Sequence, residues 1–142
     1  RGEGVISVLL ESSLPSGKPN PIREQCRQSE PWELIRFISS ATNQDGRSAS
    51  ITAPSGPAQT ACIRKSLVEA MLNPPEITMG ECHGTGTALG DPIEVGSGRI
   101  VNDPFERHIP YILGATKTHF GHLELGAGII GLIRATVNLS FG

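Results

Sequence analysis

The 142-residue chain has few cysteines, no run of basic residues and no long apolar segment. Its formal net charge is −2 and its lysines and arginines are scattered, so it lacks the electrostatic footprint of a nucleic-acid-binding protein. The longest apolar stretch, residues 125–133, falls well short of the roughly 20 residues that a membrane-spanning helix needs. We therefore expect neither a nucleic acid nor a membrane as a partner.

The three cysteines, Cys26, Cys62 and Cys82, are odd in number and follow no metal-type or disulfide-type spacing. This usage is typical of a reducing compartment, and we expect a cytoplasmic protein. The hydrophobic content of 37% and the charged content of 18% are those of a folded domain.

Strand-like and helix-like segments alternate along the chain. We expect strands at residues 4–11, 33–41, 76–83 and 111–116, and helices at residues 57–72, 91–101 and 125–139. Residues 12–32, with four prolines, form a connecting excursion. This alternation predicts an α/β layered fold with mostly parallel strands and helices on the faces of the sheet.

The helix boundaries carry their own signals. Ser55 before Pro57 is typical of a helix cap, and Asp91 before Pro92 suggests a second one. The first helix should turn one apolar face inward, made of four residues: Ile63, Leu67, Ala70 and Met71. Residues 125–139 are apolar nearly all round, which predicts a buried helix.

Two polar segments follow predicted strands. "ECHGTGTALGDPIE" (81–94) places His83 at the end of one strand, and "KTHFGHLE" (117–124) is the exit loop of another. In open α/β sheets, ligands bind at the carboxyl ends of the strands. We therefore expect His83, Lys117 and His122 to lie around one pocket, where they could stabilise an enolate or a tetrahedral oxyanion. For any one of them, a solvated surface position or a hydrogen-bonded core position is the simpler interpretation.

The glycine–threonine loop that follows His83 leaves two interpretations open. Its backbone amides could hold a phosphate near a helix N-terminus, but the order of residues is not that of a nucleotide P-loop. Alternatively, Gly84, Gly86 and Gly90 only satisfy tight turns. A metal site is disfavoured, because the short pair His119 and His122 is not completed by a familiar ligand set.

No cysteine has the setting of a nucleophile. Cys82 is adjacent to His83, but neighbouring residues on a strand point to opposite faces. Cys62 lies inside a predicted helix, where a packed thiol is expected, and Cys26 lies in the proline-rich excursion.

At this point the motifs resemble a known family. "ECHGTGTALGDPIE" and "GATKTHFGHLELGAGIIGLIRA" resemble the two C-terminal active-site motifs of β-ketoacyl synthases, specifically the ketosynthase domains of modular polyketide synthases. "GEGVISVLLE" at the start and "TNQDGRSASITAPSGPAQ" (42–59) also resemble the family in its order. The resemblance covers most of the chain, with residues 12–32 as the exception.

The resemblance implies a thiolase-like layered fold, of which this chain would be the C-terminal half, a mixed sheet with helices on its faces. Residues 1–11 would be the last strand of the N-terminal half, residues 12–32 the connecting excursion, and residues 33–142 the C-terminal half. Such domains are acyltransferases, usually homodimers, that act in polyketide or fatty-acid biosynthesis. They perform decarboxylative Claisen condensation between a cysteine-bound acyl group and a malonyl-type thioester on an acyl carrier protein.

By the same resemblance, His83 and His122 would be the paired catalytic histidines, Lys117 the lysine that organises the second histidine, and Glu124 its support. Thr85 and Thr87 would line the channel for the phosphopantetheine arm of the acyl carrier protein. No cofactor is expected to bind directly, and no metal. The partners would be the carrier protein, the N-terminal ketosynthase half and other synthase modules.

Two departures from the family pattern affect the expected function. The nucleophilic cysteine of the family lies upstream of "GEG", so the fragment is expected to be incomplete as an enzyme. His119 stands where the family usually has asparagine. This difference, with the unusual segment 12–32, motivates an alternative function as a non-elongating scaffold that binds carrier-borne intermediates. The isolated chain is also expected to self-associate, because half of a two-half fold exposes the face that meets its partner, here including the helix at residues 125–139.

Overall fold

The computed structural model of the protein describes residues 35, 37–46 and 53–141. The predicted strand at residues 4–11 and the excursion at residues 12–32 lie outside them. Within the described residues, the sheet has two strands, β1 (Met79–Glu81) and β2 (Ile112–Gly114), which run parallel. The helix α3 (Gly90–Asn102) crosses between them, and this β–α–β order confirms the predicted parallel pairing.

The described part of the predicted strand at residues 33–41 has no regular secondary structure, so that prediction is wrong there. Ser39 within this segment, and Asn43 just after it, bond to a helix instead of to a neighbouring strand. Ser39 Oγ donates to the carbonyl oxygen of Ser66 at 2.8 Å, and Asn43 Nδ2 donates to that of Ala58 at 2.6 Å. These side-chain contacts hold the segment against helix α2, and its described residues join no sheet.

Helix α2 (Gly56–Ala70) begins and ends on local signals. The predicted cap at its start is confirmed, because Ser55 Oγ accepts a hydrogen bond from the backbone N–H of Ala58 at 3.3 Å. The helix ends where Met71 adopts a left-handed conformation, with φ of 56°. Met71 is 90% exposed, so it does not belong to the inward apolar face predicted for it.

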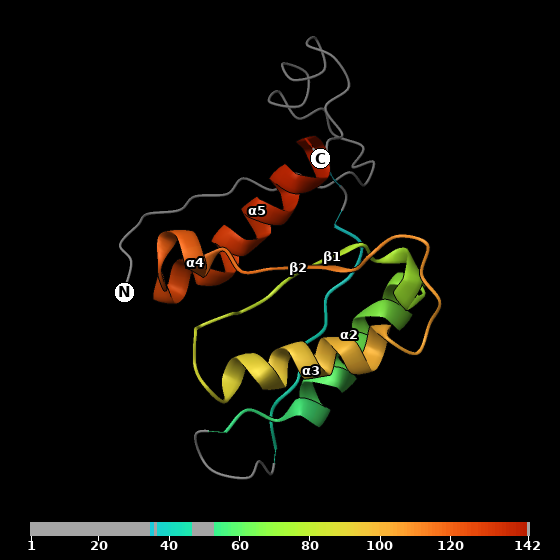
Figure 1. Ribbon diagram of the computed structural model, residues 1–142, viewed down its shortest axis with the longest axis horizontal. Coiled ribbons are helices and arrows are strands. Elements are labelled where there is room, and N and C mark those ends of the chain that lie inside the picture. The colour runs from blue at the N-terminus through green and yellow to red at the C-terminus, as the bar shows by residue number, and fades with distance from the viewer. Residues whose placement is uncertain (1–34, 36, 47–52, 142) are drawn as a thin grey trace, which may run out of the picture.

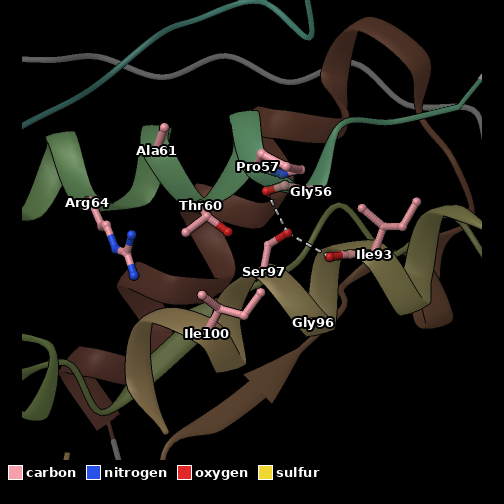
Figure 2. Close-up of a pocket in the computed structure, with 9 residues that line it drawn as sticks. All are labelled: Gly56, Pro57, Thr60, Ala61, Arg64, Ile93, Gly96, Ser97 and Ile100. Carbon is pink, nitrogen blue, oxygen red and sulfur yellow. Dashed lines mark hydrogen bonds between the residues drawn. The ribbon is translucent and has the colours of Figure 1, made fainter. Parts of the chain in front are cut away.

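Helices α2 and α3 pack against each other and leave a groove of about 780 Å³ between them. Figure 2 shows the groove, with Thr60 and Arg64 from α2 facing Ile93 and Ile100 from α3. Ser97 Oγ joins the two helices, lying 2.7 Å from the Ile93 carbonyl oxygen and 3.2 Å from that of Gly56. None of the predicted site residues lines this groove.

Helix α5 (Ala127–Phe141) packs on β1, and Figure 1 shows it on the opposite side of the strand pair from α2 and α3. This gives the helix–sheet–helix layering that the alternating pattern predicted. The predicted burial of this helix is wrong on one side, where Leu132 is 44%, Val137 48% and Leu139 68% exposed. The apolar residues surround the helix, whereas the described strands cover it from one direction. The exposed side agrees with the expectation that the isolated chain exposes this helix. No helix among the described residues is both long enough and apolar enough to cross a membrane.

Arg107, in the connection between α3 and β2, fixes the approach to both strands. Its guanidinium donates to the carbonyl oxygens of Pro74, at 2.8 Å, and of Ile77, just before β1. It also donates to Asn102 Oδ1 at 3.0 Å and lies 5.3 Å from the ring centroid of Tyr111. One side chain thus ties the entry of β1 to the entry of β2.

Candidate active site

The two predicted polar segments leave the sheet at the same edge. Glu81 and Gly114 are paired at the ends of β1 and β2, and Cys82 N continues the pairing by donating to the Gly114 carbonyl oxygen at 2.7 Å. Because the strands are parallel, the residues that follow each of them emerge side by side. This placement confirms that the His83 loop and the segment beginning at Lys117 share one edge.

His83 and His122 meet across that edge. Their ring centroids lie 5.4 Å apart, and the ring planes are nearly perpendicular, at 88°. The imidazoles come from different loops, so the contact exists only when the sheet is formed. Of the four histidines in the sequence, the two that the motifs singled out are therefore the two that the fold brings together.

The surroundings of His83 favour its neutral form. Partial burial lowers the pKa of His83 below its ordinary value, and the positive charge of Lys117 lowers it further. Glu94 and Asp91 act in the opposite direction, and the net result is still a lowered pKa. At neutral pH the imidazole is uncharged and can donate one N–H bond.

A hydrogen bond also sets the tautomer of His122. Its Nδ1 accepts from the backbone N–H of Glu124 at 2.9 Å, so Nδ1 is unprotonated and the ring proton of the neutral form is on Nε2. Glu124 holds its amide there in a left-handed conformation, with φ of 51°. The arrangement leaves His122 Nε2–H as a donor.

The predicted exit loop at residues 117–124 contains short helical turns, which a loop prediction does not include. The single-turn helix α4 (Lys117–Phe120) follows β2 directly, and a 3₁₀ turn, η2 (Glu124–Gly126), leads into α5. Lys117 is half-buried, while His119 is exposed on α4. The first residue of the motif thus lies at the site, whereas His119 faces solvent.

The glycine–threonine loop is held by carboxylates from α3. Glu94 accepts from two consecutive backbone amides, those of His83 at 2.5 Å and Gly84 at 2.9 Å. Asp91 accepts from the amide of Gly86 at 3.1 and 3.2 Å. These carboxylates fill the positions at which a phosphate would bind the amides, so the geometry does not support a phosphate cradle.

The same contacts correct the predicted start of α3. Its first residue is Gly90, so Asp91 lies in the first turn and is not the cap. Thr87 Oγ1 accepts from the backbone N–H of Gly90 at 3.1 Å, so Thr87 rather than Asp91 pairs with the first amide of the helix. The carboxylate of Asp91 is thereby free to turn back to the loop.

The His83 loop and the segment that contains Lys117 and His122 form two walls of the site. Gly84 in the first wall lies against Ala115, which leads from β2 into the second. Gly84 has φ of +51°, and a Cβ built there would lie 2.6 Å from the Cβ of Ala115, in the segment after β2. A side chain at this position is excluded by conformation and by space together. Gly86, with φ of +76°, has open space around it.

Thr85 and Thr87 follow in the same loop, with their hydroxyl oxygens 3.4 Å apart. Thr85 is half-buried and Thr87 is exposed. Both lie on the segment of chain that connects His83 to α3, and the Thr87 hydroxyl accepts from the backbone N–H of Gly90 at the start of that helix.

The structure also disfavours Cys82 as the nucleophile, because its thiol is held protonated. Burial raises the pKa of Cys82 to about 11, and the negative charges of Glu94, Glu81 and Asp91 contribute in the same direction. The nucleophilic thiolate is therefore scarce at neutral pH. Among the described residues, no group of three or more His, Cys, Asp or Glu side chains is placed to hold a metal ion.

Sequence reasoning missed the residues that hold the loops. Glu94 lies within the first motif but was given no role, and Glu81 opens that motif. The available signal was an acidic side chain one turn into a helix whose preceding loop is rich in unpaired amides. Gly84 carried a signal as well, but the partner that requires it, Ala115, is distant in sequence.

Comparison with known proteins agrees with this geometry. Residues 35–142 match the family described as beta-ketoacyl synthase, C-terminal domain. The chain is 44% identical, over its whole length, to a phenolphthiocerol/phthiocerol polyketide synthase of Mycobacterium tuberculosis. It is 38% identical, over 99% of its length, to an erythronolide synthase of Saccharopolyspora erythraea. The chain spans only 6% and 4% of these relatives.

Solved structures give the same result for the fold. The ketosynthase from module 6 of the bacillaene synthase of Bacillus subtilis 168 superimposes with a TM-score of 0.65 at 34% identity. The match covers 70% of this chain and 18% of that one. The predicted thiolase-like α/β fold is thereby confirmed. The chain belongs to the β-ketoacyl synthase family, as the C-terminal half of a ketosynthase of the polyketide-synthase type.

Proposed function

We propose that this chain supplies the decarboxylating half of a ketosynthase active site. In this proposal the enzyme joins an acyl group to a malonyl-type unit, both carried as thioesters, by decarboxylative Claisen condensation. The observation that carries it is the pair His83 and His122, whose rings face each other at 5.4 Å from opposite walls of the site. Family membership supports the reaction class.

The protonation states suit two hydrogen-bond donors aimed at one oxygen. His83 is neutral because its pKa is lowered, and His122 carries its proton on Nε2 because Nδ1 accepts from Glu124. Two N–H donors can hold a thioester carbonyl oxygen and strengthen their bonds as that oxygen becomes negative. Lys117 adds a positive charge that favours the same anion and keeps His83 unprotonated.

The reaction balances without a further cofactor. The bond between the malonyl α-carbon and its carboxylate breaks, carbon dioxide leaves, and the electron pair forms the thioester enolate. The two histidines hold the enolate oxygen. The α-carbon then attacks the acyl thioester, a carbon–carbon bond forms, and the cysteine thiolate leaves. Stabilising the developing anion is worth several kcal/mol in sites of this kind.

The remaining assignments follow from the same site. Thr85 and Thr87, on the loop that follows His83, contact the phosphopantetheine arm of the acyl carrier protein, and Glu124 supports Lys117. The nucleophilic cysteine comes from the upstream half of the ketosynthase, since Cys82 is held as a thiol by a pKa of about 11. The exposed apolar side of α5 is the side that meets this half.

The wider setting is proposed on the same grounds. The partners are an acyl carrier protein, the upstream half and the other modules of a cytoplasmic synthase, and the working form is a homodimer. The named relatives are synthases many times longer than this chain, which supports a place within a larger assembly.

The test uses a ketosynthase that joins this chain to its upstream half. His83→Ala and His122→Ala should each lower malonyl-thioester decarboxylation by at least ~100-fold and abolish condensation. Self-acylation of the upstream cysteine should be retained. His108→Ala, at an exposed histidine between α3 and β2, is the matched control and should leave both steps unchanged.

The outcomes separate the proposal from the alternative function. Full condensation by either histidine variant would overturn the assigned roles. A wild-type protein that accepts acyl groups or binds carrier protein but never decarboxylates malonyl thioesters would instead favour the non-elongating scaffold.

A further inference from the structure

Glu81 is a nearly buried carboxylate that the reaction proposed above does not use. It is the last residue of β1, and only 12% of its side chain is exposed. Burying a charged group is costly unless partners surround it, so its position calls for an explanation.

Its partners come from two elements outside β1. Oε1 accepts from the backbone N–H of Thr116 at 2.5 Å, across 35 residues of sequence. Oε2 accepts no hydrogen bond within the described residues but lies 3.6 Å from Arg134 Nη1 on α5. One carboxylate therefore joins the end of β1, the start of α4 and the middle of α5.

Two glycines leave room for this carboxylate. A Cβ at Gly131 on α5 would lie 3.1 Å from Glu81 Cγ, and one at Gly114 on β2 would lie 3.0 Å from Oε2. Both distances are tighter than ordinary contact. The small residues on both neighbouring elements thus fix where the carboxylate sits.

Thr116 connects the position of the Glu81 carboxylate to the site. It is 2% exposed, it precedes Lys117, and its carbonyl oxygen accepts from the backbone amides of His119, at 3.0 Å, and Phe120, at 3.3 Å. Holding the Thr116 amide therefore holds the whole turn of α4. Glu81 itself lies two residues before His83, so it links the two walls.

We propose that Glu81 is a positioning residue that sets the distance between the His83 loop and the Lys117–His122 segment through the Thr116 amide. The inference rests on the proposed function for its effect on catalysis. The essential property is the reach of the acceptor oxygen rather than the charge. The charges that act on the pKa of His83 are those of Lys117, Glu94, His122 and Asp91, and Glu81 is not among them.

Two substitutions separate reach from charge, tested in a ketosynthase that joins this chain to its upstream half. Glu81→Gln keeps the acceptor in place and loses the charge, whereas Glu81→Asp keeps the charge and shortens the reach. We expect kcat for decarboxylation within about threefold of wild type for Gln, and a loss of ~10- to 100-fold for Asp. KM and the acidic limb of the pH profile should stay unchanged in both.

The matched controls are Glu69→Gln and Glu69→Asp on α2, where the carboxylate pairs with Lys65 at the surface and kcat should not change. A readout independent of activity is hydrogen exchange of the Thr116 amide, which should be faster in the Asp variant and protected in the Gln variant. A Gln variant as impaired as the Asp variant, or an Asp variant with wild-type kcat, would overturn the inference. If Thr116 exchange responds to the Glu81 substitutions as expected but the wild-type protein does not decarboxylate malonyl thioesters, the proposed function is overturned and the positioning role stands.

Discussion

The two walls of the site are held by different means. The His83 loop is fixed by carboxylates close in sequence, because Glu94 lies 10 and 11 residues, and Asp91 5 residues, from the amides they bind. The Lys117–His122 segment is fixed through Thr116 by Glu81, which is 35 residues away. The first wall is therefore determined by its own motif, whereas the second depends on the assembled sheet.

The difference determines how each wall responds when another part of the domain moves. A loop that carries its own anchors keeps its shape when the rest of the domain shifts. A segment anchored from another strand moves whenever the strand moves. Catalysis by paired donors needs both walls at a fixed separation, so substitutions that change the separation should cost more than those that change one wall.

The largest effect is expected at Gly84, where the walls touch. Gly84→Ala would place a methyl group 2.6 Å from the Cβ of Ala115 and should push the walls apart. We expect decarboxylation to fall ~100-fold. Gly86→Ala carries a similar backbone penalty, because φ is +76°, but it meets nothing within 4 Å and should cost far less activity.

A compensating change sharpens this test. Ala115→Gly removes the methyl group that Gly84→Ala would meet, so the double variant should recover much of the lost activity. Equal losses in the Gly84 and Gly86 variants, without recovery in the double variant, would show that backbone conformation rather than wall separation is responsible.

The next effect is expected at the local anchor Glu94. Glu94→Gln has one acceptor oxygen for two amides, so the backbone at His83 should loosen, and we expect a loss of ~10-fold in decarboxylation. Asp91→Asn disturbs only Gly86, further along the loop, and should have a smaller effect. Steady-state rates on a malonyl thioester measure both, and a larger loss in the Asp91 variant would contradict this ranking.

A further effect, on the pH dependence of decarboxylation, is expected from the positive charge that Lys117 places near His83. That charge disfavours protonation of His83, so Lys117→Met should raise the pKa of His83 toward its ordinary value of 6.5. The acidic limb of the decarboxylation profile should then move to higher pH, because more of His83 is protonated at a given acidic pH. Lys117→Arg keeps the charge and should leave the limb in place. Titration of the His83 ring by NMR measures the shift, and an unchanged or lowered pKa in the Met variant would contradict it.

The smallest effect is expected at Cys82, which adjoins the site without taking part. Cys82→Ala should leave decarboxylation within about twofold of wild type, since the thiol is protonated at neutral pH. With a pKa of about 11 in place of 9.0, its thiolate fraction is roughly 100-fold lower than that of an ordinary thiol, and alkylation at pH 8 should be correspondingly slow. Rapid labelling of Cys82 would show that the carboxylates around it do not act as described.

The sequence predicts much of this architecture because its main signals are local. The cap at Ser55, the parallel strand pair and the shared edge of His83 and His122 follow from turn residues and periodicity. The misplaced cap at Asp91 has a different origin, since Thr87 and Asp91 are both chemically able to cap and only the loop geometry decides between them. Likewise, the run at residues 33–41 has strand composition, but Ser39 finds a partner on α2.

What could not be predicted is non-local. The contact of Glu81 with Thr116 and the approach of Gly84 to Ala115 join segments more than 30 residues apart in the chain, and no periodic pattern marks such pairs. The exposed side of α5 is similar, because composition shows that a helix is apolar but not which neighbour covers it.

The long separation between Glu81 and Thr116 also has a kinetic consequence. Their bond closes a loop that contains all of α3, and closing such a loop costs chain entropy before the contact is gained. Contacts of this kind slow folding, so the helices and the His83 loop should acquire structure before the second wall docks. The two imidazoles would then approach each other only in the last stage of folding. A nuclear Overhauser effect between their ring protons would therefore report that the domain has finished folding.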